Sequence, residues 1–137
     1  GISVVEYLEA ERRWVSVRDM PRAIISPSVV ALNGKLLVIG GWQKAAGNRS
    51  GPTCAVLEYN PADRSWKELP RLLTARYRCA VTVLGGDVVA IGGTKANCHC
   101  LKELERFNRR WQCWQAMASL PESMDWPVAA VVPLDMF

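Results

Sequence analysis

Hydrophobic residues occur along this chain in short, valine-rich runs that end at proline, glycine or polar residues. Residues 28–32 (SVVAL) and 80–84 (AVTVL) are two such runs. A two-residue turn, Asn33-Gly34 or Gly85-Gly86, leads from each into a second apolar run. Because these residue pairs tolerate positive φ, they close tight hairpins. The pattern therefore predicts antiparallel β-strands and an all-β fold.

The second apolar runs share one ending, LLVIGG at 36–41 and VVAIGG at 88–93, which places Gly40-Gly41 and Gly92-Gly93 one repeat apart. An aromatic residue followed seven positions later by a tryptophan recurs in step with these glycines. The three pairs are Tyr7 with Trp14, Tyr59 with Trp66, and Phe107 with Trp114. The chain is therefore built from repeats of about 50 residues, a period typical of solenoids and propellers.

Each repeat predicts four antiparallel strands, which cannot bury both faces of their sheet alone. Radial stacking of such sheets gives a β-propeller of about 4–8 blades. On this interpretation residues 1–17 end one blade, residues 24–68 and 76–116 form two whole blades, and residues 127–137 (beginning PVAAVV) start another. We expect the glycine pairs where backbones approach closely, and the aromatic residues in the seams between blades.

This pattern resembles the kelch repeat. The resemblance rests on the two glycine pairs and the three aromatic–tryptophan pairs, in that family's order and spacing, and it covers essentially the whole chain. It implies an incomplete kelch propeller with two whole blades and parts of two others. The copies differ in places: the third has Phe107 instead of tyrosine, and Ile24 and Met124 stand where the second copy has Arg76.

The composition is that of an ordinary globular domain, with half of the 137 residues hydrophobic and 22% charged. No apolar run approaches the ~20 residues that cross a bilayer, and the N-terminus lacks a signal-peptide pattern. The net charge of +4 is scattered along the chain, which disfavours nucleic-acid binding. Five cysteines at irregular spacings predict free thiols in a reducing compartment. We therefore expect a cytoplasmic protein whose partner is neither a nucleic acid nor a membrane.

Residues suited to catalysis or metal binding are few. His99 is the only histidine, and no G-x-S-x-G motif supports a hydrolase. The run Cys98-His99-Cys100, followed by Cys113, suggests zinc, but C-x-C does not fit the usual spacing of a structural site. The copper centre of some kelch-like propellers needs several His and Tyr ligands, whereas Tyr7 and Tyr59 already have blade positions. We expect no metal, no cofactor and no enzyme activity, with a kelch-like enzyme as the less favoured alternative.

The loops expected on one face of the propeller are rich in basic residues. On the kelch pattern, loops 42–52 and 94–99 follow the glycine pairs, and segments 21–26 and 70–78 link successive blades. None of the four contains an acidic residue. Arginine binds carboxylates bidentately, and aromatic side chains supply binding hot spots. The candidate partner-binding residues are Arg22, Lys44, Arg49, Arg76, Tyr77, Arg78 and Lys95.

We therefore predict that this face binds an acidic segment of another protein, with Arg76 and Arg78, on either side of Tyr77, as the leading contacts. In kelch adaptors of ubiquitin ligases, arginines on this face receive acidic substrate segments. The resemblance thus implies substrate recruitment for a cullin-type ligase, and an actin-binding cytoskeletal scaffold is the alternative.

Two plainer interpretations stay open. The basic loop residues are also compatible with ordinary solvated charges that have no partner. Packing in the core or between blades is the first expectation for Trp42, Trp111 and Trp126, against a role as exposed recognition residues. The half blades at both ends expose unpaired strand edges, so we expect further blades or self-association to cover them.

Overall fold

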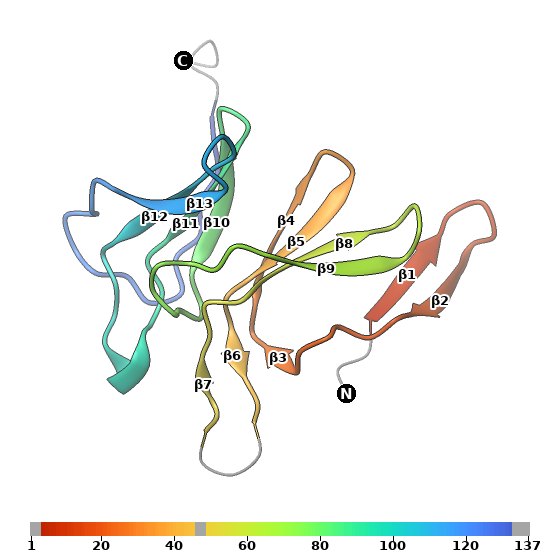
Figure 1. Ribbon diagram of the computed structural model, residues 1–137, viewed down its shortest axis with the longest axis horizontal. Helices are drawn as coiled ribbons and strands as arrows, with labels where there is room; N and C mark the ends of the chain where they lie inside the picture. The colour runs from red at the N-terminus through yellow and green to blue at the C-terminus, as the bar shows by residue number, and fades with distance from the viewer. Residues whose placement is uncertain (1–3, 46–48, 133–137) are drawn as a thin grey trace.

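The computed structural model describes residues 4–45 and 49–132, and strands provide nearly all of the regular structure there (Figure 1). A short 3-10 turn, η1 (Ala96–Cys98), is the one helical element of these residues. Three of the four antiparallel sheets in the described residues each take their strands from one repeat, and these three follow one another in chain order. The prediction of an all-β fold built from four-stranded antiparallel blades is confirmed.

The first of these sheets, the N-terminal hairpin, pairs β1 (Val4–Leu8) with β2 (Arg13–Val17). The middle blade contains β4 (Ser28–Leu32), β5 (Lys35–Ile39), β8 (Val56–Asn60) and β9 (Ser65–Leu69), hydrogen-bonded in that order. The C-terminal blade repeats the arrangement with β10 (Ala80–Leu84), β11 (Asp87–Ile91), β12 (Leu104–Asn108) and β13 (Cys113–Met117). The inner strands β4 and β10 contact each other.

The predicted hairpin turns have the geometry that their residues favour. Asn33 and Gly34 have φ values of 52° and 73°, and Gly85 and Gly86 have 59° and 82°. Positive φ at both central residues suits the twist of the flanking strands. These turns pair Leu32 with Lys35 and Leu84 with Asp87 and so set the register of each inner hairpin.

A small sheet that the sequence did not predict lies beside the middle blade. Its strands are β3 (Ile24–Ile25), β6 (Trp42–Gln43) and β7 (Gly51–Pro52), in the order β3-β6-β7. The 42–52 stretch, expected to be a polar loop, therefore contains a pair of short strands that points away from the blades (Figure 1). Two-residue strands carry too short a pattern for periodicity to reveal.

The glycine pairs lie where the link to the next blade crosses the end of a strand. The backbone amide of Gly41 donates to the carbonyl of Arg76 at 2.9 Å, and Gly93 donates likewise to Met124 at 2.9 Å. Gly40 has a φ of +62°, and a Cβ there would lie 2.4 Å from the Arg76 oxygen. Glycine is needed because the backbone conformation and the close approach both exclude a side chain.

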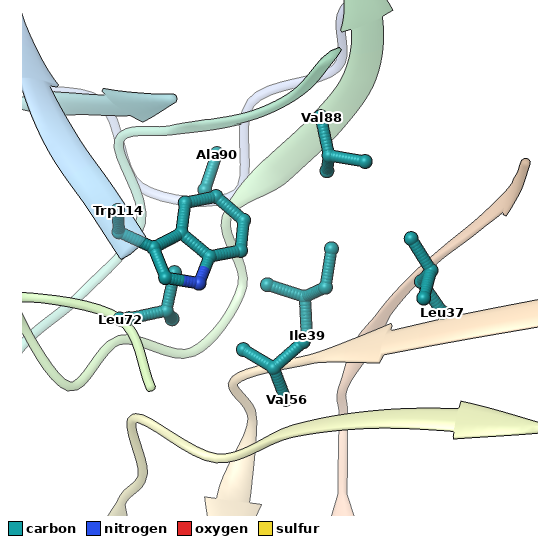
Figure 2. Packing of buried hydrophobic residues seen from close by; sticks show 7 residues of the cluster. All are labelled: Leu37, Ile39, Val56, Leu72, Val88, Ala90 and Trp114. Atoms are coloured by element: carbon teal, nitrogen blue, oxygen red, sulfur yellow. The ribbon is translucent and has the colours of Figure 1, made fainter. Parts of the chain in front are cut away.

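Two of the repeat tryptophans, Trp66 and Trp114, pack across the seams between sheets. Trp114 of β13 lies against Ile39 and Val56 of the middle blade (Figure 2). Its indole nitrogen donates to the carbonyl of Pro70 at 2.9 Å. Trp66 repeats this arrangement one blade earlier by donating to the carbonyl of Arg18 at 2.8 Å. Each tryptophan therefore joins its own blade to the segment that follows the preceding blade.

No strand is formed at 127–132, where the start of a further blade was expected, and the assignment of 127–137 to that blade stays a prediction. Residues 127–132 lie in no strand, and Val128 is 96% exposed. A strand requires a neighbour to accept and donate its backbone hydrogen bonds, and the described residues provide no such neighbour for this run. Residues 133–137, the remainder of the expected blade, lie outside the described residues.

Candidate partner-binding surface

Three residues at equivalent repeat positions lie close together at the end of the blades where the inner strands β4 and β10 begin. Ser26 and Arg78 each precede an inner strand by two residues, and Trp126 has the same place in the third linking segment. Their φ values are 48°, 57° and 57°, which is uncommon for residues other than glycine. All three line a hollow of about 390 Å³ that also reaches the starts of β4 and β10. The turns before β4 and β10, and the equivalent turn in the third linking segment, thus each direct a side chain to this hollow.

Aromatic side chains hold Arg78 from two sides. Its guanidinium carbon lies 4.8 Å from the ring centroid of Trp126 and 5.2 Å from that of Tyr77. Trp42 of β6 packs edge-on against Tyr77, with ring centroids 5.2 Å apart. Arginine is attracted to the faces of aromatic rings at these distances. We call Trp42, Tyr77, Arg78 and Trp126 the aromatic–arginine cluster.

A backbone bridge joins the linking segment 70–78, which carries Tyr77 and Arg78, to the 94–99 loop after the second glycine pair. Tyr77 and Thr94 exchange both backbone hydrogen bonds, at 3.0 and 2.8 Å. The hydroxyl of Thr94, which is buried, donates to Oδ1 of Asp125. Oδ2 of the same carboxylate lies 3.6 Å from Nη1 of Arg78. Arg78 therefore has a carboxylate neighbour from a third segment of the chain.

Arg76 was predicted to be a leading contact, and the structure shows that this is wrong. Its side chain is 0% exposed. Nη2 donates to Oε2 of Glu105 at 2.8 Å, while Nη1 donates to the carbonyls of Gly92 and Glu103 at 2.9 Å. Glu105 also accepts the backbone amides of Leu73 and Thr74. Buried charges need this kind of pairing, so Arg76 fastens the linking segment to its own blade.

Arg22 has a neighbour that the loop sequences did not reveal. Its guanidinium donates to Glu68 of β9 and to the side-chain oxygen of Gln43. The hydrogen bond from Arg22 lowers the pKa of Glu68. Although the four basic loops contain no acidic residue of their own, Glu68 and Asp125 approach two of their arginines from neighbouring segments.

The remaining predicted residues lie outside the aromatic–arginine cluster. Lys44, Arg49 and Lys95 are exposed, and none of them lines the hollow beside Arg78. Lys44 directly follows β6 and Arg49 lies two residues before β7. Lys95 borders η1. The structure thus brings together Tyr77 and Arg78 of the predicted set, with the other basic groups on adjoining loops.

Comparison with protein families identifies the repeat. The kelch motif model matches residues 26–73 and 75–121, which is more than half of the chain. The chain belongs to the kelch-repeat family. Both matched stretches run from the turn before an inner strand to the segment after the fourth strand, so they correspond to the middle and C-terminal blades.

The chain is also similar to longer kelch proteins. It is 28% identical over 94% of its length to human kelch-like protein 34 and covers 21% of that protein. It is 27% identical over 84% of its length to kelch repeat and BTB domain-containing protein 12 of Danio rerio, covering 20%. Mouse kelch domain-containing protein 7A shares 30% identity over 84% of the chain, which covers 14% of that relative. The chain spans about a fifth of the length of the first two relatives.

A solved structure supports the same fold. The structure of YjhT superposes with a TM-score of 0.73 over 87% of this chain and 44% of that protein, at 17% identity. At that identity the likeness concerns the fold. Kelch repeats build protein-interaction β-propellers, and this chain has the repeat's sequence and the arrangement of its blades.

The residues that the sequence analysis missed in this kelch chain are Asp125 and, as members of the cluster, Trp42 and Trp126. Trp126 is 67% exposed, so packing in a seam does not explain it. Trp111, also expected in a seam, is exposed beneath Arg110 at the opposite end of the C-terminal blade. The repeat register could have found Trp126, because it stands at the position of Arg78. Nothing local marks Asp125, since its neighbours come from elsewhere in the chain.

Of the thiols and the single histidine of the kelch chain, Cys79 directly follows Arg78 and lines the hollow beside it, whereas the other four cysteines and His99 do not line that hollow. All five cysteines are free, and Cys98 and Cys100 are exposed on the loop that carries His99. Burial raises the pKa of the Cys79 thiol. Within residues 4–45 and 49–132, no three His, Cys, Asp or Glu side chains gather as metal ligands. No helix in this described part has the length and apolarity to cross a membrane.

Proposed function

We propose that this chain is part of a cytoplasmic protein-interaction propeller and that the aromatic–arginine cluster binds an acidic segment of a partner protein. The observation that carries the proposal is the placement of Arg78, which is 39% exposed, at the mouth of the inner strands with two aromatic neighbours. The function proposed is binding without chemistry, a metal or a cofactor.

The cluster combines charge with apolar area in the way that binding hot spots do. Arginine, tyrosine and tryptophan dominate such hot spots because they join large contact areas to directed polar groups. Stacked aromatic rings also limit the conformations of Arg78, which reduces the entropy lost when a carboxylate binds. These features favour a contact at Arg78 over the interpretation of simple solvated charges.

The neighbouring basic residues extend the proposed surface. Lys44, Arg49 and Lys95 are exposed on the adjoining loops, and Arg22 stands beside Gln43 at the base of the β6 strand. Such charges attract an acidic segment over about 10 Å at ~0.1 M salt and raise its association rate. We expect these four residues to affect the rate and the salt dependence more than the final affinity.

The complete protein is proposed to recruit substrates for a cullin-type ubiquitin ligase. Support comes from the names of its relatives, which include a kelch repeat and BTB domain-containing protein and a putative F-box/kelch-repeat protein of Arabidopsis thaliana. Further blades, or a second copy of the chain, are proposed to cover the exposed edge at the N-terminal hairpin. The exposed Trp14 supports that part of the proposal.

The experiment compares Arg78→Ala with Arg110→Ala in a binding measurement. Arg110 is a matched control because it also stacks on an exposed tryptophan, Trp111, at 5.3 Å, but at the opposite end of its blade. Fluorescence anisotropy of a labelled glutamate-rich peptide, and of the same peptide with glutamine, measures the affinity. We expect a dissociation constant no lower than about 1 μM for this 137-residue chain.

Arg78→Ala should weaken binding of the glutamate peptide at least about tenfold, as removal of a hot-spot side chain does, whereas Arg110→Ala should not. The glutamine peptide should not bind measurably to the wild type or to either variant. Equal affinities of the two variants would contradict the proposal and leave the basic loops as solvated surface. Thermal melts of both variants show whether either substitution has disturbed the fold.

A further inference from the structure

Asp125 is held next to Arg78 by a contact on its other side. Thr94, 4% exposed, is fixed by the two backbone hydrogen bonds that it exchanges with Tyr77. Its hydroxyl donates to Oδ1 of Asp125, which leaves Oδ2 directed toward the guanidinium. The carboxylate therefore lies at the site where an incoming carboxylate would meet Arg78.

The contact between Asp125 and Arg78 is an incomplete one. Oδ2 and Nη1 are 3.6 Å apart, whereas a charge-assisted hydrogen bond brings such atoms to about 2.7–2.9 Å. Both side chains are 39% exposed, and exposed ion pairs stabilise proteins little. Arg78 thus retains donors for a carboxylate that approaches with bidentate geometry, and Asp125 is easily replaced.

We propose that Asp125 is an internal competitor that occupies Arg78 in the unbound protein, and that a partner's carboxylate binds by displacing it. This inference rests on the function proposed above, because it assumes that Arg78 receives an acidic segment. In the unbound protein the pair neutralises part of the cluster. Binding exchanges one carboxylate for another. The net binding free energy at Arg78 is therefore the difference between its contact with the partner's carboxylate and its contact with Asp125.

The arrangement favours ligands that offer more than one contact. A single carboxylate with ordinary geometry gains little over Asp125 itself. A segment with several acidic residues, or with an apolar group that packs on Trp126 or in the hollow beside it, gains contacts that Asp125 cannot make. Asp125 therefore selects against weakly acidic or isolated ligands. The aromatic rings hold Arg78 in place while the exchange occurs.

The decisive variant is Asp125→Asn. The asparagine side chain retains an oxygen that can accept from Thr94 but loses the negative charge that faces Arg78. Removal of the competitor should raise the affinity for the glutamate-rich peptide about two- to fivefold, since exposed pairs have effects of this size. The salt dependence of binding should also become steeper, because the cluster gains one net positive charge.

Two controls separate this effect from a general change in charge. Glu122→Gln removes one charge from the same linking segment, and no ion pair involves Glu122 in the described residues. It should leave the affinity nearly unchanged. In the double variant Arg78→Ala/Asp125→Asn the gain should vanish, because a competitor matters only while its site exists. If Asp125→Asn fails to fold, Asp125→Ala tests the same charge.

The outcomes distinguish this inference from the function on which it rests. If the wild type binds the glutamate-rich peptide, and Asp125→Asn and Asp125→Ala leave that affinity unchanged or weaken it, the competitor role would be overturned but not the proposed function. An equal gain with Glu122→Gln would also overturn it, since the effect would then be nonspecific. Failure of wild type and of every Asp125 variant to bind the peptide would overturn both.

Discussion

Trp14 and Trp114 hold equivalent positions in the first and last of the three aromatic–tryptophan pairs, but their surroundings differ. Trp14 is 66% exposed and Trp114 is 4% exposed. Within its own hairpin each packs on its aromatic partner in much the same way, with centroids 5.1 Å apart for Tyr7–Trp14 and 5.5 Å for Phe107–Trp114. The hairpin therefore sets the local geometry, and the preceding blade provides the burial.

The intermediate case, Trp66, supports the same interpretation. It is half-buried, and its aromatic partner Tyr59 lies 4.9 Å away. The two-stranded N-terminal hairpin precedes its blade, whereas a complete four-stranded sheet precedes Trp114. Burial of the repeat tryptophan thus increases with the extent of the sheet before it. The repeat tryptophan joins its blade to the preceding sheet, so its contribution to stability depends on whether that sheet is present.

The largest predicted effect is at the seam between the middle and C-terminal blades, which Trp114 fills. Trp114→Ala should lower the free energy of unfolding by about 3–5 kcal/mol, because it removes a buried ring and leaves a cavity among Ile39, Val56 and Ala90. It also leaves the carbonyl of Pro70 without its indole donor. Urea denaturation measures the change. A loss below about 1 kcal/mol would show that the seam does not hold the blades together.

Breaking the buried ion pair between Arg76 and Glu105 should have a similar effect. Arg76→Met copies the residue that Met124 provides one repeat later, but at Arg76 it leaves the carboxylate of Glu105 buried without its cation. Breaking a buried pair in this way costs about 3–5 kcal/mol. Adding Glu105→Gln should recover part of the loss, because the amide is neutral. Denaturation of the single and double variants tests this, and an additive loss would contradict it.

A smaller difference is expected between the two glycine pairs. Gly40→Ala should destabilise the chain more than Gly92→Ala, because the added Cβ would lie 2.4 Å from the Arg76 oxygen in one case and 3.1 Å from the Met124 oxygen in the other. Both positions have φ near +60°, so both also carry the strain of that backbone conformation, about 1–3 kcal/mol. Thermal melts of the two variants give the order, and the reverse order would contradict the comparison.

What the sequence could predict follows from the distance over which each interaction acts. The glycine pairs, the hairpin turns and the aromatic–tryptophan pairs are local patterns that repeat, so they indicated the blades directly. Arg76 looked like a surface residue because its partner, Glu105, lies in a strand of the same blade far along the chain. Asp125 was missed for the same reason, since it meets Arg78 only after the segment that follows β13 has folded back against the C-terminal blade.

The strand expected at 127–132 marks another limit of pattern analysis. Its composition is that of an inner strand, but a strand forms only when a neighbour pairs with its backbone. Likewise the short strands β3, β6 and β7 arise because the linking segment 21–26 pairs with the 42–52 loop and that loop pairs with itself, which no periodicity of two residues can indicate. Local pattern predicts which segments can become strands, and tertiary contacts decide which of them do.

The smallest predicted effect is at the uncovered face of the N-terminal hairpin. Trp14→Ala should change the free energy of unfolding there by less than about 1 kcal/mol, as is usual for exposed residues. Its ring still packs on Tyr7, so a small loss is expected. In a complete propeller, where another blade is proposed to cover this face, the same substitution should cost about as much as Trp114→Ala. Denaturation of Trp14→Ala in both contexts tests the comparison. Equally small losses of stability in both proteins would mean that no blade packs on Trp14. A large loss in the 137-residue chain would mean that Trp14 stabilises the fold without burial by a neighbouring blade.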